Sequence, residues 1–155
     1  MTPRHLTALT AAVLLLAGCG GDPEPKSQAS PTPAATSRAP LPLLVRGTFT
    51  LERSTFAWSE KTQVCAGMGG HDDIAGGAQV IITDPAGVNL AVGKLDVGQP
   101  LIDPTDATRA TSCLFTFKIP GVPSGKGIYG VEVSRRGKVQ FNEVDLGKPI
   151  SLGLT

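Results

Sequence analysis

Side chains suited to catalysis or metal binding are scarce in this sequence. Its 155 residues include three cysteines, two histidines, one tryptophan and one tyrosine, and only 17% of the residues are charged. It has no CxxC, HExxH or GxSxG pattern, so the local signatures of thiol redox, zinc-protease and serine-hydrolase chemistry are missing. It also has no run of about 20 apolar residues, the length that a membrane-spanning helix requires. These gaps favour a protein that is not an enzyme and has no metal site.

The N-terminal segment has the form of a bacterial lipoprotein signal. Arg4 gives it a positive start, residues 6–17 are apolar apart from two threonines, and small residues precede Cys19. We expect residues 1–18 to be cleaved and the Cys19 thiol to carry a diacylglycerol, which would anchor the protein to the extracytoplasmic face of the cell membrane. A secretory signal with an incidental cysteine is the alternative.

The segment after Cys19 is rich in proline and poor in large apolar residues. Six prolines lie among Ser, Thr, Ala and Gln between residues 20 and 42, and large apolar side chains are almost absent before Leu41. Such a composition buries too little apolar surface to offset the entropy of ordering. We therefore expect residues 19–42 to be a disordered tether and residues 43–155 to form one domain.

The charge of the expected domain is balanced. Residues 43–155 contain eleven Lys and Arg and eleven Asp and Glu. Proteins that bind nucleic acid show a clear basic excess, which neutralises phosphates. The composition therefore disfavours a nucleic-acid partner.

Two cysteines remain once Cys19 is assigned to lipidation. Cys65 and Cys113 form an even pair, which favours a disulfide in an oxidising compartment. A redox-active thiol and a metal ligand are the alternatives, although neither CxxC nor metal-ligand spacing is present. We expect a structural disulfide that joins a long loop at Cys65 to a strand at Cys113.

Seven segments have the composition and alternation of β-strands. The clearest is 113–119, in which every second residue is apolar. Residues 84–87 have turn chemistry, five glycines in 67–77 indicate an irregular loop, and no segment combines helical period, caps and length. The pattern predicts an all-β fold, an antiparallel two-sheet sandwich of about seven strands of the immunoglobulin-like or transthyretin-like type. The expected strands span residues 44–51, 78–83, 89–95, 113–119, 128–134, 138–141 and 149–154.

The order of motifs from residue 78 onward resembles transthyretin-like and carboxypeptidase-regulatory-like β-sandwich domains. The motifs are a D-x-x-G turn, an F-x-F-x-x-P strand, a P-x-G step before a tyrosine and a glycine turn, carried by Asp84, Gly87, Phe115, Phe117, Pro120, Pro123, Gly125, Tyr129 and Gly137. With the pattern C-x-G-x-G-G-x-D-D-I from Cys65, the chain is similar to a group of small actinobacterial lipoproteins of unassigned activity. The resemblance implies an envelope β-sandwich and does not imply an activity.

His71, Asp72 and Asp73 form the most chemical-looking cluster of the sequence. One interpretation is a cation site in the glycine-rich loop, joined by Asp103 or Asp106, although Ca²⁺ requires six to eight oxygen ligands. The other is that the two aspartates cap backbone groups of the loop. His71 lacks the local signature of a catalytic histidine, and in the lipoprotein group that the chain resembles an aromatic residue is usual at this position.

Trp58, Arg135 and Arg136 are the remaining candidate binding residues. Trp58 lies in a polar stretch, where its ring either faces a carbohydrate or partner, or packs beside the disulfide. Arg135 and Arg136, with Lys126 and Lys138 nearby, either meet an anionic wall polymer or lipid headgroup, or form a solvated hairpin tip.

The sequence therefore predicts a lipid-anchored, extracytoplasmic, non-enzymatic interaction module of the cell envelope. We expect no cofactor besides the diacylglycerol on Cys19, a membrane contact through that lipid, and an envelope protein or a wall polymer as partner. The alternative is an accessory lipoprotein that binds a small ligand or a cation through the glycine-rich loop 67–77.

Overall fold

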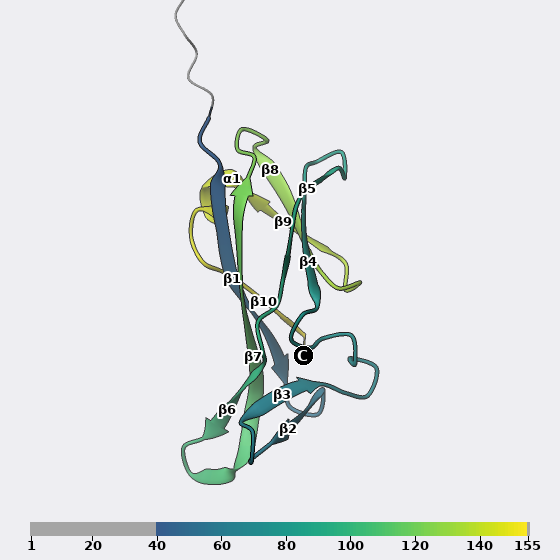
Figure 1. Ribbon diagram of the computed structural model, residues 1–155, viewed down its shortest axis with the longest axis vertical. Coiled ribbons are helices and arrows are strands. Elements are labelled where there is room, and N and C mark those ends of the chain that lie inside the picture. The colour runs from purple at the N-terminus through teal and green to yellow at the C-terminus, as the bar shows by residue number, and fades with distance from the viewer. Residues whose placement is uncertain (1–39, 155) are drawn as a thin grey trace, which may run out of the picture. The chain divides into compact units, whose positions relative to one another are not determined.

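The structure is a computed structural model that describes residues 40–154, and these residues form an all-β fold with one short helix (Figure 1). Residues 1–18, Cys19 and nearly all of the expected tether lie outside the described residues. The strands fall into two four-stranded sheets and one two-stranded sheet. The elements are β1 (Leu43–Glu52), β2 (Phe56–Ser59), β3 (Val64–Gly67), β4 (Gln79–Thr83), β5 (Asn89–Lys94), β6 (Gln99–Asp103), β7 (Asp106–Val122), β8 (Ile128–Val133), β9 (Lys138–Asn142), α1 (Glu143–Leu146) and β10 (Ile150–Leu154).

The first four-stranded sheet has the order β10-β1-β7-β6. β1 pairs antiparallel with β7, Phe49 opposite Phe115, and parallel with β10, Gly47 opposite Ile150. The expectation of a wholly antiparallel sandwich is wrong at this edge. The reason is that the chain crosses from β9 in the other sheet through α1 and then enters β10 in the direction of β1.

The second four-stranded sheet has the order β5-β4-β8-β9 and is antiparallel throughout. The predicted turn between β4 and β5 is present, because Gly87 N donates to Asp84 O at 3.0 Å and Gly87 has φ of 84°. Glycine takes this left-handed conformation without steric cost. Asp84 Oδ1 also accepts from the backbone of Ala86 and Val88, which fixes the turn.

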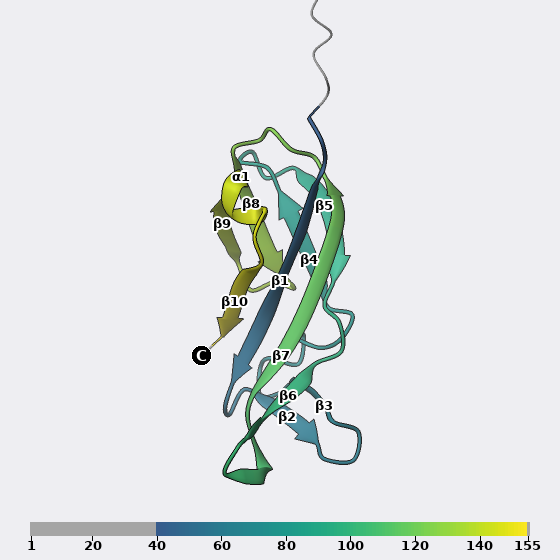
Figure 2. The same cartoon turned by 90° about the vertical axis from the view of Figure 1, so that its left-hand side faces the viewer.

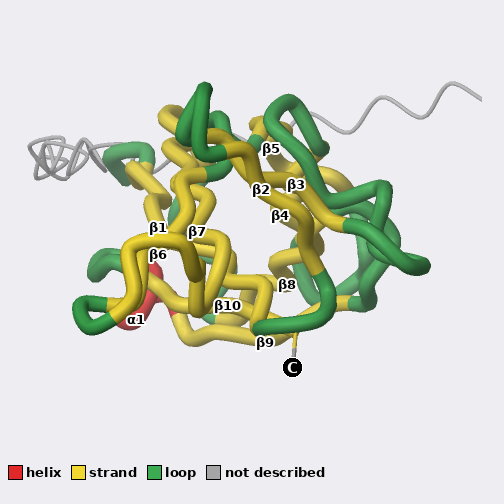
Figure 3. The backbone as a smooth tube through the Cα atoms, turned by 90° about the horizontal axis from the view of Figure 1, so that it is seen from below, coloured by secondary structure: helices red, strands yellow, loops and turns green. Residues whose placement is uncertain are grey.

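Both four-stranded sheets contribute to one core. Apolar residues alternate with polar ones along β1 and β7, so that one face of their sheet is buried, and β4 and β8 bury their faces in the same cluster. In Figure 2 strands β10, β1 and β7 lie in front of β4, β5, β8 and β9, and Figure 3 shows β1, β6 and β7 on one side with β4, β5 and β8 on the other. No described element covers the outer face of β1 and β7 in Figure 2.

The structure has ten strands in residues 40–154, where the sequence predicts about seven. β2, β3 and β6 are short or contain small and polar residues, so their composition does not mark them as strands. Cys65 lies in β3 and not in a loop, and it forms a disulfide with Cys113 of β7 across a Cα–Cα distance of 5.9 Å. The disulfide joins the β2–β3 hairpin to the first sheet.

Candidate functional site

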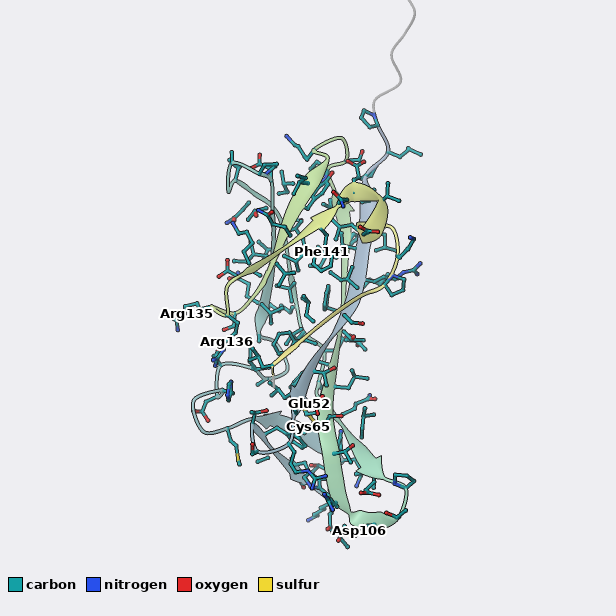
Figure 4. All side chains as sticks on the ribbon, turned by 180° about the vertical axis from the view of Figure 1, so that it is seen from behind. Glu52, Cys65, Asp106, Arg135, Arg136 and Phe141 are labelled. Carbon is teal, nitrogen blue, oxygen red and sulfur yellow. A yellow bond between two sulfur atoms is a disulfide. The ribbon has the colours of Figure 1, made fainter. Side chains whose placement is uncertain are left out.

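Two of the candidate groups bind each other. Arg136 lies in the turn between β8 and β9, and its guanidinium donates from Nε to Asp73 Oδ2 at 3.1 Å and from Nη2 to Asp73 Oδ1. The same Nη2 donates to the carbonyl oxygen of Gly70 at 2.7 Å. Arg136 thereby fastens the glycine-rich loop to the β8–β9 turn, and Figure 4 shows its side chain diverging from that of Arg135.

The electrostatics of Asp73 follow from this ion pair. Hydrogen bonding from the Arg136 guanidinium holds the pKa of Asp73 below its ordinary value, against the smaller opposing effect of desolvation. Asp72 is exposed, and His71 is half-buried with its Nδ1 buried and without a hydrogen-bond partner among the described residues. The described residues contain no group of three or more His, Cys, Asp or Glu side chains arranged to hold a metal ion. Both carboxylate oxygens of Asp73 accept from Arg136, so a cation at Asp73 would compete with the guanidinium.

The loop that presents these residues is ordered by its own backbone. Gly67 N donates to Ile74 O at 2.8 Å, and the Ile74 side chain is fully buried in the core. Gly70 has φ of 94°, a conformation that a side chain would strain. The sequence predicts an irregular glycine-rich loop here, and the structure adds that Ile74 and Arg136 hold it at two points.

Trp58 lies in a different region, on β2. Its cross-strand partner on β3 is Cys65, and its half-buried ring packs against the core beside the disulfide. The structure therefore does not bring Trp58 together with the His71–Asp73 loop into one described site.

A second intramolecular cluster, which the sequence analysis did not identify, surrounds Tyr129. The hydroxyl oxygen of the fully buried Tyr129 lies 3.0 Å from Pro123 O and 3.1 Å from Glu143 Oε2, so its single proton is shared between these two acceptors. Glu143 Oε2 also accepts from the backbone amides of Gly125 and Gly127 at 2.8 and 3.3 Å. This carboxylate fixes the loop between β7 and β8 to the start of α1.

The Tyr129–Glu143 pair perturbs both groups. Burial raises the pKa of Tyr129. Desolvation opposes ionisation of Glu143, but the hydrogen bonds from Gly125, Gly127 and Tyr129 together outweigh it and hold the pKa of Glu143 below its ordinary value. The cluster closes on itself, so its role is to order a loop.

The outer face of β1 and β7 carries an open hollow with a volume of about 360 Å³. Arg46 and Lys118 lie directly opposite each other on the two strands. Two residues further along the same face, Thr48 lies opposite Thr116. Thr48 Oγ1 lies 3.5 Å from Ser151 Oγ of β10. The hollow is lined by Arg46, Gly47, Thr48, Asp96, Thr116, Phe117, Lys118 and Pro149.

Asp96 completes the polar rim of the hollow. Its backbone amide donates to Thr116 O at 2.8 Å, and its Oδ2 accepts from Thr116 Oγ1 at 2.5 Å. Sequence reasoning missed this hollow because its residues come from separate segments. The only sequence signal was the polar half of the alternation in β1 and β7, which pointed to an exposed face without a function.

A smaller apolar slot lies between the edge strands β9 and β10. Its volume is about 60 Å³. It is lined by Phe49, Val131, Val133, Arg136, Gly137, Val139, Leu152, Gly153 and Leu154. This volume is well below the roughly 300–1,000 Å³ of small-ligand sites.

Comparisons with known proteins return no family for this chain. No protein-family model, curated protein or solved structure matches it. Within residues 40–154, no helix combines the length and the apolar character that crossing a membrane would require.

Proposed function

We propose that this chain is a lipid-anchored, extracytoplasmic, non-enzymatic interaction module of the cell envelope. Its anchor would be the diacylglycerol on Cys19, and its partner an envelope protein or a wall polymer. The fold type that accompanies this proposal is a two-sheet β-sandwich of the transthyretin-like class with added β2, β3 and β6 strands. The shared core of the two four-stranded sheets, the loop that Tyr129 holds before β8 and the turn at Asp84 support that type.

One observation carries the binding role, the open hollow on the outer face of β1 and β7. The two sheets bury their inner faces, and the reactive side chains Asp73, Arg136 and Glu143 are engaged in bonds that order loops. The exposed cations Arg46 and Lys118 of the hollow are open to a partner instead. A strand face with a hydrogen-bonded backbone is suited to recognition, because little ordering entropy is lost when a partner binds.

The test of the binding role is photo-crosslinking on intact cells. A benzophenone amino acid at Ser151, the β10 neighbour of the lining residue Thr48, is expected to capture a defined envelope component. The matched control carries it at Asn89, an exposed position at the start of β5. Equal capture from both positions, or none from Ser151, would refute this face as the binding surface.

The anchor has its own test. Cys19→Ala should move the protein from the membrane fraction to the soluble or secreted fraction, because no diacylglycerol can then be attached. Metabolic labelling with a fatty-acid analogue should label the parent chain and not the variant. Membrane retention of the variant through detergent-free washes would contradict the anchor.

One observation favours the second candidate function, a small-ligand or cation site in loop 67–77. His71 Nδ1 is buried and lacks a partner among the described residues, so a ligand could supply one. Asp73→Asn would remove the ion pair with Arg136 and loosen the loop, and is therefore a poor test. Asp72→Asn and His71→Ala leave the Asp73–Arg136 bond in place. Loss of Ca²⁺ or Zn²⁺ binding by these variants in calorimetry would support the loop site. No heat of binding from the parent chain would refute it.

A further inference from the structure

We propose that the hollow on β1 and β7 binds a hydroxyl-bearing phosphodiester, such as a glycerol phosphate or sugar phosphate unit. The inference rests on the proposed function, because it names the ligand chemistry of the same face. It is carried by the charges, the hydroxyl groups and the volume of the hollow.

The opposed cations are the first part of the argument. Arg46 and Lys118 are Cα partners in an antiparallel pair, and both are exposed on the same face. Like charges directly opposite each other destabilise a sheet. Neither residue forms an ion pair within residues 40–154. An anion placed between them would convert this repulsion into two favourable contacts.

The net charge of the rim favours a singly charged anion. Arg46 and Lys118 contribute two positive charges and Asp96 one negative charge, so the rim carries a net charge of about +1. A phosphodiester carries a single negative charge and complements it. The guanidinium of Arg46 can bind two phosphate oxygens in its planar fork, while Lys118 acts as a point charge.

The rest of the rim is suited to the hydroxyl groups of such a ligand. Asp96 uses Oδ2 for Thr116 and no hydrogen bond occupies its Oδ1 among the described residues, so Oδ1 can accept from a ligand hydroxyl. Thr48 and Ser151 are only 3.5 Å apart and weakly bonded, and either hydroxyl can donate to a phosphate oxygen. Pro149 offers apolar surface to the carbon chain.

The volume agrees with this ligand class. A hollow of about 360 Å³ is at the lower end of the roughly 300–1,000 Å³ range of small-ligand sites. This volume is sufficient for one polyol phosphate unit. Two sources present such units at a cell surface, the headgroup of an anionic phospholipid and a polyol phosphate polymer, and they share the chemistry that the hollow would recognise.

The experiment is an amide NMR titration of the full chain in nonionic micelles with glycerophosphoglycerol, a soluble diester. We expect saturable shifts confined to the amides of residues 46–48, 96 and 116–118. Arg46→Gln or Lys118→Gln should weaken binding at least about tenfold, the factor for loss of about 1.4 kcal/mol, which is at the lower end for a charged contact. Lys61→Gln, an exposed site outside the hollow, is the matched control and should bind as the parent does.

A charge reversal separates binding from folding. Lys118→Glu places opposite charges across the strands, so the melting temperature should equal or exceed that of the parent while diester binding is lost. If Lys118→Glu and Lys118→Gln both bind the diester as the parent does, the proposal is wrong. It is also wrong if the shifts match those from sodium chloride at equal ionic strength.

Two further probes identify which cell-surface molecule supplies the phosphodiester. Poly(glycerol phosphate) and micelles doped with phosphatidylglycerol are compared with phosphatidylcholine micelles, and the source is the probe whose binding falls in Arg46→Gln. Failure of the diester to bind while Ser151 still captures an envelope partner would overturn this inference alone. Failure of both experiments would overturn the binding face as well.

Discussion

Removing the disulfide should cost this domain a large part of its stability. The perturbation is the double substitution Cys65→Ala with Cys113→Ala, or reduction of the parent chain. Cys65 and Cys113 are 2% and 0% exposed, so reduction acts on a buried bond and is expected to require partial unfolding. The bond ties the β2–β3 hairpin to the long strand β7, and few other bonds hold that hairpin.

The expected magnitude follows from the chain length that the bond closes. For a separation of 48 residues, the loop-entropy relation gives about 4 kcal/mol of stabilisation. A domain of this size has a net free energy of unfolding of about 5–15 kcal/mol. The loss should therefore lower the melting temperature by about 10–20 °C.

The chain contains its own spectroscopic probe. Trp58 is the single tryptophan, and its cross-strand partner is Cys65. Urea unfolding followed by Trp58 fluorescence reports on the hairpin, while far-ultraviolet circular dichroism reports on all strands. The reductant should have no effect on the double variant, which controls for its action on other groups. A double variant within about 1 kcal/mol of the parent would refute the reasoning, since the entropy relation requires about four times as much.

Three further perturbations test other contacts. Gly98→Ala should lower the free energy of unfolding by about 1–3 kcal/mol, because its Cβ would lie 2.6 Å from Phe115 and 2.9 Å from the sulfur of Cys113. The control is Gly147→Ala, at a residue with φ of −69° and 3.4 Å to the nearest atom, which should change the free energy of unfolding by no more than about 0.5 kcal/mol. Equal effects of the two substitutions in thermal unfolding would contradict the packing argument. Arg136→Met should raise hydrogen exchange in residues 67–77 while lowering global stability by about 1 kcal/mol or less, since the ion pair is partly exposed, and unchanged exchange would show that the pair does not hold the loop. Glu143→Gln should destabilise the domain at neutral pH, and progressively less as the pH falls below the ordinary carboxyl pKa of 4.5. The reason is that the pKa of Glu143 is lowered in the fold, so its ionised form stabilises the fold and protonation removes this contribution. A difference in urea midpoint between variant and parent that does not change with pH would contradict this prediction.

Local patterns in the sequence predicted the local parts of the fold. The apolar alternation from Cys113 to Ile119 identified the centre of β7, and residues 84–87 identified the β4–β5 turn. The pairing of the two cysteines could also be predicted, because only two remained once Cys19 was assigned to lipidation. The short helix α1 was missed, since four residues are too few to show a helical period.

Long-range register could not be predicted in this way. Arg136 and Asp73 are separated by 63 residues, and nothing near either residue indicates the other. The parallel pairing of β1 with β10 depends on how the chain crosses between sheets, which has no local signature. The hollow requires the register of β1 against β7, since a shift of one residue would place Arg46 opposite an inward-facing position.

The central position of β1 in its sheet has a mechanical consequence. Any pull transmitted through residues 1–42 enters the domain at Leu43, the first residue of β1, and β1 is bonded on both sides, by β7 and by β10. A force along the strand loads the two rows of hydrogen bonds together, in shear, and does not open them one after another from an edge. The first strand of the domain is thus placed to bear tension. A ligand bound near Arg46 would take up the force on the same strand, within a few residues of Leu43, where the force enters the domain.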